Sequence, residues 1–144
     1  MTRRNCSTRP SERGPRVRGP DAAATLMRVL VCGNHHDGEF VLALDRSDRF
    51  VGYASREGDQ AWFPLDAMQL EMIAAELQAE AVVLVTFVDD DRIAPSLADV
   101  ARYEGLVLEC ADEGVALLDQ LLMSGHRWRS VGEVSVGRDA STTW

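Results

Sequence analysis

Residues 84–99 of this 144-residue chain, Leu-Val-Thr-Phe-Val-Asp-Asp-Asp-Arg-Ile-Ala-Pro-Ser-Leu-Ala-Asp, decide its fold class. The stretch begins inside a continuous apolar run, residues 81–88, of the kind that forms a central strand buried on both faces of a sheet. An acidic turn follows, and Ser96 with Asp99 then matches the Ser-x-x-Asp pattern of a helix start. A buried strand that leads directly into a helix predicts an α/β domain.

Apolar patterns on either side of this stretch predict the remaining elements. Residues 26–32 form either a strand or the end of a helix. Residues 65–77 and 96–110 carry apolar side chains at three- and four-residue spacing, which predicts two amphipathic helices, the second ending at Gly114. Further strands are predicted at residues 40–44, 49–55, 115–123 and 128–131. Strand pairs that alternate with two helices predict a layered α/β domain with a mixed β-sheet flanked by helices.

Composition limits the class of protein. Apolar residues make up 46% of the chain, enough for the core of one compact domain. No apolar run approaches the roughly 18–20 residues that a membrane span needs, and no apolar segment follows the first arginines as in a secretory signal peptide. Cys6, Cys32 and Cys110 are odd in number and lack a Cys-x-x-Cys pair, which favours reduced thiols. We therefore expect a cytoplasmic protein without membrane contact.

Charge separates a basic beginning from an acidic body. Residues 1–20 hold six arginines and one glutamate, a local charge of about +5 by counting. Because the whole chain carries −8, residues 21–144 carry about −13. We expect residues 1–25 to be a disordered Arg- and Pro-rich tail, residues 26–134 to form the domain, and residues 135–144 to be a C-terminal tail.

The basic tail has two interpretations. It is either an arm that binds nucleic acid by neutralising phosphates, or a solvated segment that precedes a true start at Met27. A charge run alone does not decide between them. The acidic body argues against direct duplex binding by the domain, because like charges repel the phosphates.

Several motifs follow the order and spacing of a known family. They are Asp37-Gly-Glu39-Phe-Val, Ser96-Leu-Ala-Asp99, Glu113-Gly-Val-Ala-Leu-Leu-Asp119-Gln-Leu-Leu and Gly125-His-Arg-Trp-Arg-Ser130. Together they resemble the RadC-like branch of the JAB/MPN (JAMM) metalloprotease superfamily. The resemblance implies a single three-layer JAB/MPN domain, similar to the cytidine-deaminase fold.

The resemblance also implies where a zinc site would lie. In that family the metal is held by two histidines of a His-x-His motif and by the Asp of Ser-x-x-Asp, and a Glu acts as general base. Glu39 then matches the general base, Ser96 the oxyanion-stabilising residue and Asp99 the metal ligand. Thr86 and Val88 occupy the two histidine positions, and neither side chain binds zinc. We therefore expect a site degenerate at its metal-binding histidines, with no cofactor.

Each of these residues also has a purely structural interpretation. Ser96 and Asp99 suffice as a helix N-cap and its capping box, and Glu39 suffices as a solvated residue at the start of a strand. Asp89–Asp91 could supply oxygen ligands to Ca²⁺ or Mg²⁺. Consecutive aspartates point in different directions, however, which favours a solvated acidic turn.

Three functional hypotheses remain. The first is a catalytically inactive, zinc-less pseudo-metalloprotease that acts through contacts with a protein partner. The second is a divergent metal-dependent JAB peptidase or isopeptidase, in which His35 or His36 joins Asp99 in binding zinc. The third is a DNA-repair-associated protein of the RadC type, which reaches nucleic acid through its Arg-rich tail. We favour the first, because a hydrolytic zinc site needs three protein ligands and both imidazoles are missing.

Overall fold

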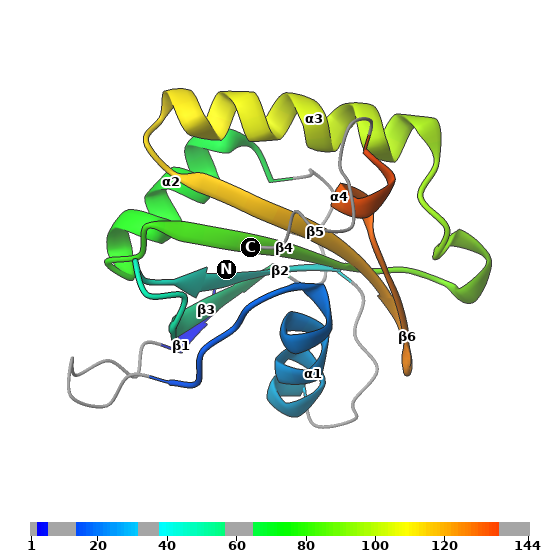
Figure 1. Ribbon diagram of the computed structural model, residues 1–144, viewed down its shortest axis with the longest axis horizontal. Helices are drawn as coiled ribbons and strands as arrows, with labels where there is room; N and C mark the ends of the chain where they lie inside the picture. The colour runs from blue at the N-terminus through cyan, green and yellow to red at the C-terminus, as the bar shows by residue number, and fades with distance from the viewer. Residues whose placement is uncertain (1–2, 6–13, 32–37, 57–64, 136–144) are drawn as a thin grey trace.

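The computed structural model of the protein describes residues 3–5, 14–31, 38–56 and 65–135. These residues form a six-stranded sheet with helices on both faces (Figure 1). The strands are β1 (Arg3–Asn5), β2 (Gly38–Leu44), β3 (Phe50–Arg56), β4 (Ala81–Phe87), β5 (Ala116–Ser124) and β6 (Arg127–Ser130). The helices are α1 (Pro20–Val31), α2 (Ala67–Glu76), α3 (Leu97–Asp112) and α4 (Val131–Val134), with a 3₁₀ turn, η3 (Asp90–Arg92).

The sheet is mixed, with strand order β1-β3-β2-β4-β5-β6. β4 and β5 run parallel and are connected through α3, whereas every other neighbouring pair is antiparallel. Helix α1 covers one face, and α2 and α3 cover the other (Figure 1). The predicted layered α/β architecture with a mixed sheet is confirmed. None of the helices in the described part of the chain is long and apolar enough to cross a membrane.

The central strand β4 separates two hydrophobic cores. Val82 and Leu84 pack into the core beneath α2 and α3, whereas Val83 and Val85 pack into the core against α1. All four side chains are fully buried, which confirms the prediction of a strand covered on both faces. Burial of each such side chain stabilises the fold by about 1.5–3 kcal/mol.

Capping boxes begin both helices of the α2/α3 layer. At α3 the Ser96 hydroxyl accepts a hydrogen bond from the Asp99 backbone N–H at 3.1 Å, and the Asp99 carboxylate accepts one from the Ser96 N–H at 2.8 Å. Asp66 and Gln69 form the same reciprocal pair at α2. The structural interpretation of Ser96 and Asp99 is therefore confirmed. α3 ends before Gly114, whose positive φ of +88° suits glycine at a helix C-terminus.

The prediction of a disordered tail over residues 1–25 is wrong for residues 3–5, which form β1 and pair with β3, and for residues 14–25. Helix α1 begins at Pro20, and its Ala23 and Ala24 are fully buried against the sheet. The apolar residues at 26–32, for which a strand was one possibility, instead include the end of this helix. Sequence signals for a helix start were present, because proline is favoured in a first helical turn and Asp21 complements the helix dipole.

Residues just before α1 also belong to the fold. The Val17 side chain is buried, its backbone N–H donates to the Asp48 carbonyl at 2.7 Å, and the Phe50 N–H donates to the Pro15 carbonyl at 2.9 Å. Arg18 forms an ion pair with Asp48 at 3.3 Å. With the Gly14 N–H, which donates to the Phe50 carbonyl at 3.0 Å, three backbone hydrogen bonds and one ion pair therefore tie this segment to the β2–β3 hairpin, although it lacks any apolar periodicity. Residues 136–144, predicted as most of a C-terminal tail, lie outside the described residues.

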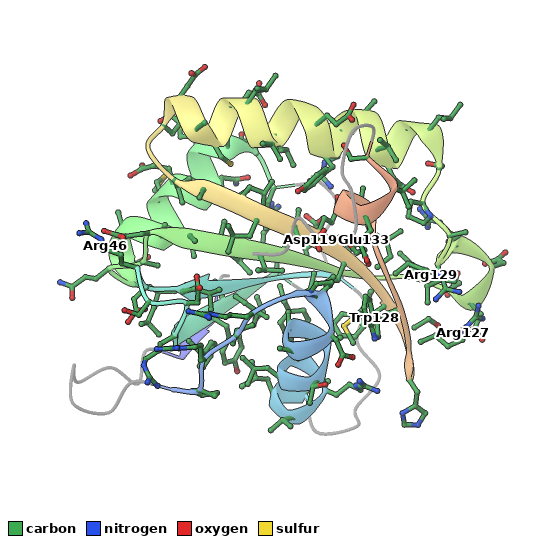
Figure 2. The ribbon with its side chains drawn as sticks, viewed as in Figure 1. Arg46, Asp119, Arg127, Trp128, Arg129 and Glu133 are labelled. Atoms are coloured by element: carbon green, nitrogen blue, oxygen red, sulfur yellow. The ribbon has the colours of Figure 1, made fainter. Side chains whose placement is uncertain are left out.

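Asp119 holds the last described elements against the sheet. Its fully buried carboxylate lies 2.6 and 2.8 Å from the Ser130 hydroxyl and accepts the backbone N–H groups of Gln120 and Gly132. Figure 2 shows Asp119 beside α4. A buried carboxylate is tolerated when donors satisfy it, and here they join β5 to the end of β6 and the start of α4. The predicted hairpin of these two strands is confirmed.

A chain that begins at Met27 should lose stable structure, because it lacks buried Val17, Ala23 and Ala24 and half of α1. We expect it to be destabilised by at least roughly 3–5 kcal/mol relative to the full chain. A chain that begins at Gly14 retains these contacts and is the matched control. Thermal unfolding followed by circular dichroism measures both, and a Met27 chain that melts like the full chain would restore the tail interpretation.

Cys110 should not react with thiol reagents in the folded protein. The side chain is fully buried, and burial together with the charges of Glu109 and Glu113 raises the pKa of the thiol to about 11. The reactive thiolate is therefore scarce at pH 8. In a Cys6→Ser/Cys32→Ser variant, a thiol-reactive dye should label Cys110 only after urea unfolding. Rapid labelling without urea would show that the α3 core opens.

Candidate functional site

A hollow of about 370 Å³ opens on the α2/α3 side of the sheet, where β2 begins and β4 ends. It draws its walls from β2, β4, the turn η3, the first turns of α3, and β5. The lining residues are Gly38, Glu39, Thr86, Phe87, Val88, Arg92, Asp99, Arg102, Gln120 and Leu122. Residues separated by up to 84 positions in the sequence therefore meet at one place.

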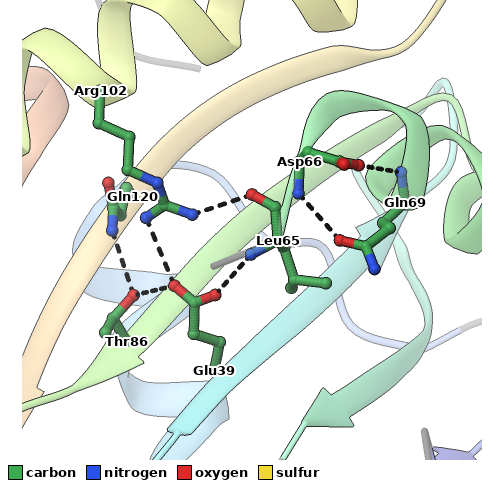
Figure 3. Close-up of polar contacts among 7 residues, drawn as sticks. All are labelled: Glu39, Leu65, Asp66, Gln69, Thr86, Arg102 and Gln120. Carbon is green, nitrogen blue, oxygen red and sulfur yellow. Dashed lines mark hydrogen bonds and ion pairs between the residues drawn. The ribbon is translucent and has the colours of Figure 1, made fainter. Parts of the chain in front are cut away.

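The Glu39 carboxylate is the centre of the polar contacts in this hollow (Figure 3). β2 and β4 pair so that Glu39 lies opposite Thr86, and the Thr86 hydroxyl donates to Glu39 Oε2 at 3.0 Å. The backbone N–H of Leu65 donates to the other oxygen, Oε1, also at 3.0 Å. Glu39 is buried, so the interpretation of a solvated strand-start residue is wrong.

Arg102 neutralises this buried carboxylate. Its Nη1 lies 3.5 Å from Glu39 Oε2, and its Nη2 donates to the Leu65 carbonyl at 2.9 Å (Figure 3). Arg102 comes one helical turn after Asp99 and points inward from α3. Glu39 therefore has a hydrogen-bond donor at each oxygen and a guanidinium beside it.

Gln120 extends the same network to β5. Its Nε2 donates to the Thr86 hydroxyl at 3.1 Å, so that hydroxyl both accepts and donates a hydrogen bond. The Gln120 Oε1 atom is buried and has no hydrogen-bond partner among the described residues. A buried amide oxygen without a hydrogen bond lowers the free energy of unfolding. The Thr86 hydroxyl is therefore held by two hydrogen bonds, one to Glu39 on β2 and one from Gln120 on β5.

The structure brings most of the predicted site residues together. The hollow is lined by Glu39, Thr86, Val88 and Asp99. One carboxylate oxygen of Asp99 accepts a hydrogen bond from the Ser96 N–H. Ser96 caps α3 and is not one of the lining residues. Within the described ranges, no three His, Cys, Asp or Glu side chains lie close enough to hold a metal ion.

Other candidates lie elsewhere or outside the described residues. His35 and His36, proposed for a relocated metal site, fall in the range 32–37 that is not described. Asp89–Asp91 form an exposed turn, and Asp90 accepts a hydrogen bond from the Ser124 hydroxyl at 2.7 Å. That arrangement agrees with the acidic-turn interpretation rather than with an ion-binding loop.

A second hollow, of about 380 Å³, lies beside β6 and is lined by residues 126–130 and Glu133. Figure 2 labels Arg127, Trp128 and Arg129 along this strand. Arg129 Nη1 donates to the Trp128 carbonyl at 3.0 Å, and Arg127 lies 3.9 Å from Asp90. Both arginines therefore interact with groups close to β6. None of the side chains that line this second hollow was predicted to be catalytic.

The sequence analysis did not select Arg102, the residue that forms an ion pair with Glu39 in the first hollow. A signal was available, because Arg102 is the only basic residue on α3 and lies three positions after Asp99, hence on a neighbouring part of the helix surface. Its partner could not be read from the sequence, since Glu39 lies 63 residues earlier.

Comparisons with known proteins identify no family. No model of a known protein family matches the chain, and no curated protein matches it. The resemblance to RadC-like JAB domains therefore stays a prediction.

The Arg102–Glu39 pair should contribute to stability. Arg102→Met leaves the buried carboxylate without its cation and is expected to destabilise the fold by about 1–3 kcal/mol. The double variant Arg102→Met/Glu39→Gln should lose less than the sum of the two single variants, because each change removes the same interaction. Urea unfolding at pH 7 measures these free energies.

Arg92→Met is the matched control, because the Arg92 side chain lines the same hollow and has no hydrogen bond or ion pair with any described residue. It should change stability by less than about 0.5 kcal/mol. Additive effects of Arg102→Met and Glu39→Gln would contradict a direct coupling between the two side chains.

Proposed function

We propose that this protein is a non-catalytic, RadC-like JAB domain that acts through contacts with another protein. The observation that carries the proposal is the ion pair of Arg102 with Glu39 in the hollow where the resemblance expects a zinc-bound water and its general base. A guanidinium supplies positive charge there, but it offers no open coordination position and generates no bound hydroxide.

The convergence of the family positions supports the JAB part of this proposal. The resemblance selected Glu39, Thr86, Val88 and Asp99 by matching sequence motifs, without knowledge of the structure, and all four line one hollow. A chance alignment of short motifs has no reason to select residues from two strands and a helix that meet in space. The mixed sheet with helices on both faces is also compatible with a three-layer JAB domain.

The replacement of both histidines supports the non-catalytic part. The Thr86 hydroxyl is engaged with Glu39 and Gln120, and Val88 offers no donor atom. Asp99 is then the only family ligand that lines the hollow, and a single carboxylate does not hold zinc at neutral pH against water. A domain of this architecture without the metal functions by binding, as is common for a fold that hosts several functions.

Restoring the two histidines should create a zinc site. Thr86→His/Val88→His adds two imidazoles to the hollow that Asp99 lines, and we expect about one zinc per chain by mass spectrometry of the purified protein, against almost none for the unchanged chain. Adding Arg102→Met should strengthen binding, because it removes a competing positive charge. Asp99→Ala in the double variant is the control and should abolish the gain.

Two results would contradict the proposal. Stoichiometric zinc in the unchanged protein, with peptide or isopeptide hydrolysis that Asp99→Ala abolishes, would establish an enzyme that uses ligands other than Thr86 and Val88. A folded double variant that binds no zinc would show that these positions do not form a JAB-type site. Circular dichroism confirms folding in each case.

A further inference from the structure

The outer surface of the α2/α3 layer carries large apolar side chains exposed to solvent. They are Met68 (63% exposed) and Met72 (59%) on α2, and Leu97 (91%) and Leu108 (70%) on α3. We call these four residues the helical outer face. α2 and α3 contact each other and cover the same face of the sheet, so these side chains belong to one layer (Figure 1).

Helical spacing places the four residues away from the core. Met68 and Met72 are four positions apart on α2, opposite the buried Leu70 and Ala74. Leu97 and Leu108 are eleven positions apart, three turns or about 16 Å along α3, on the side opposite its buried residues Tyr103, Leu106 and Cys110. Neither pair of side chains contributes to the two cores of this chain. A contiguous exposed apolar patch marks an interaction site, and we take these four side chains, on two helices that contact each other, as one such patch.

Gly105 lies in the middle of α3, between Leu97 and Leu108. A Cβ added there would meet no atom within 4 Å, so packing within the chain does not require glycine. Glycine inside a helix costs about 1 kcal/mol relative to alanine. Gly105 and the exposed Ala101 one turn before it are small, which allows another backbone to approach α3 closely between Leu97 and Leu108.

Charge on the same two helices selects the kind of partner. α2 and α3 together carry six acidic residues, Glu71, Glu76, Asp99, Glu104, Glu109 and Asp112. Asp99 lines the hollow and Glu104 accepts a hydrogen bond from the Ser135 hydroxyl at 2.6 Å, so the other four are left to flank the apolar side chains. Their one basic residue, Arg102, points inward to Glu39. Apolar side chains framed by carboxylates disfavour both an anionic membrane and a second copy of this acidic chain, because like charges repel.

We propose that the helical outer face binds an amphipathic helix of another protein, whose apolar side chains are flanked by lysine or arginine. An apolar helix face pairs with an apolar surface through anchors at three- and four-residue spacing, and methionine adapts its shape to such anchors. The basic flanks pair with carboxylates such as Glu109 and Asp112, which are exposed. This inference rests on the proposed function in one respect, since it names the partner class of a domain that acts through protein contacts.

A defined peptide tests this inference. The probe is a fluorescent 18-residue peptide of leucine and lysine with its leucines on one helical face, titrated with the full chain and followed by anisotropy. Met72→Glu and Leu108→Glu should each weaken binding at least tenfold, because they place a carboxylate in the apolar contact. Val29→Glu is the matched control, since Val29 is equally exposed (64%) but lies on α1, across the sheet.

The peptide controls separate shape from charge. A scrambled peptide of the same composition should bind more weakly, and a leucine–glutamate peptide should not bind. No binding of the probe, or equal losses in Val29→Glu and Leu108→Glu, would overturn the inference. Concentration-dependent dimers in sedimentation that Leu108→Glu abolishes would also overturn it, in favour of self-association. The zinc measurements report on the hollow around Glu39, so either idea can fail without the other.

Discussion

The arrangement of the α2/α3 side of the sheet depends on one buried carboxylate. Glu39 lies on β2, and its oxygens bind a hydroxyl from β4, the backbone N–H just before α2 and a guanidinium from α3. A buried charge must be paired and hydrogen-bonded, or its desolvation destabilises the fold. This requirement couples four elements that no local interaction brings together, and it orients the first turns of α3 over the hollow.

A metal ion and a guanidinium group can both neutralise a buried carboxylate, but they differ in what else they do. Either one compensates a buried carboxylate, but a hydrolytic metal also binds water and lowers its pKa, which a guanidinium does not do. Arg102 also donates to the Leu65 carbonyl, so it fastens the segment before α2 as well as neutralising Glu39. The charges that line the hollow are therefore explained by the contacts that hold β2, β4, the segment before α2 and α3 together.

The two sides of the helical layer have separate roles. Inward, α2 and α3 bury leucine, isoleucine and tyrosine side chains against β4 and its neighbours. Outward, the same helices expose methionines and leucines among carboxylates. An ordinary surface helix keeps its outer side polar. The exposed apolar side chains on these two helices are therefore a feature that the packing of the described residues does not account for.

Local patterns in the sequence determined the central strand, the hairpins and the capped start of α3, because each depends on neighbouring residues: the continuous apolar run of β4, the polar turns, and the Ser96–Asp99 box. The resemblance to RadC-like JAB domains, not these local patterns, selected Glu39, Thr86, Val88 and Asp99. Only the tertiary structure decided that Arg102 pairs with Glu39 and that residues 14–25 fold against the β2–β3 hairpin and the sheet. Both outcomes depend on contacts between residues distant in sequence. Pro20 and Asp21 indicate only that a helix begins, and the position of Arg102 on α3 does not indicate its partner.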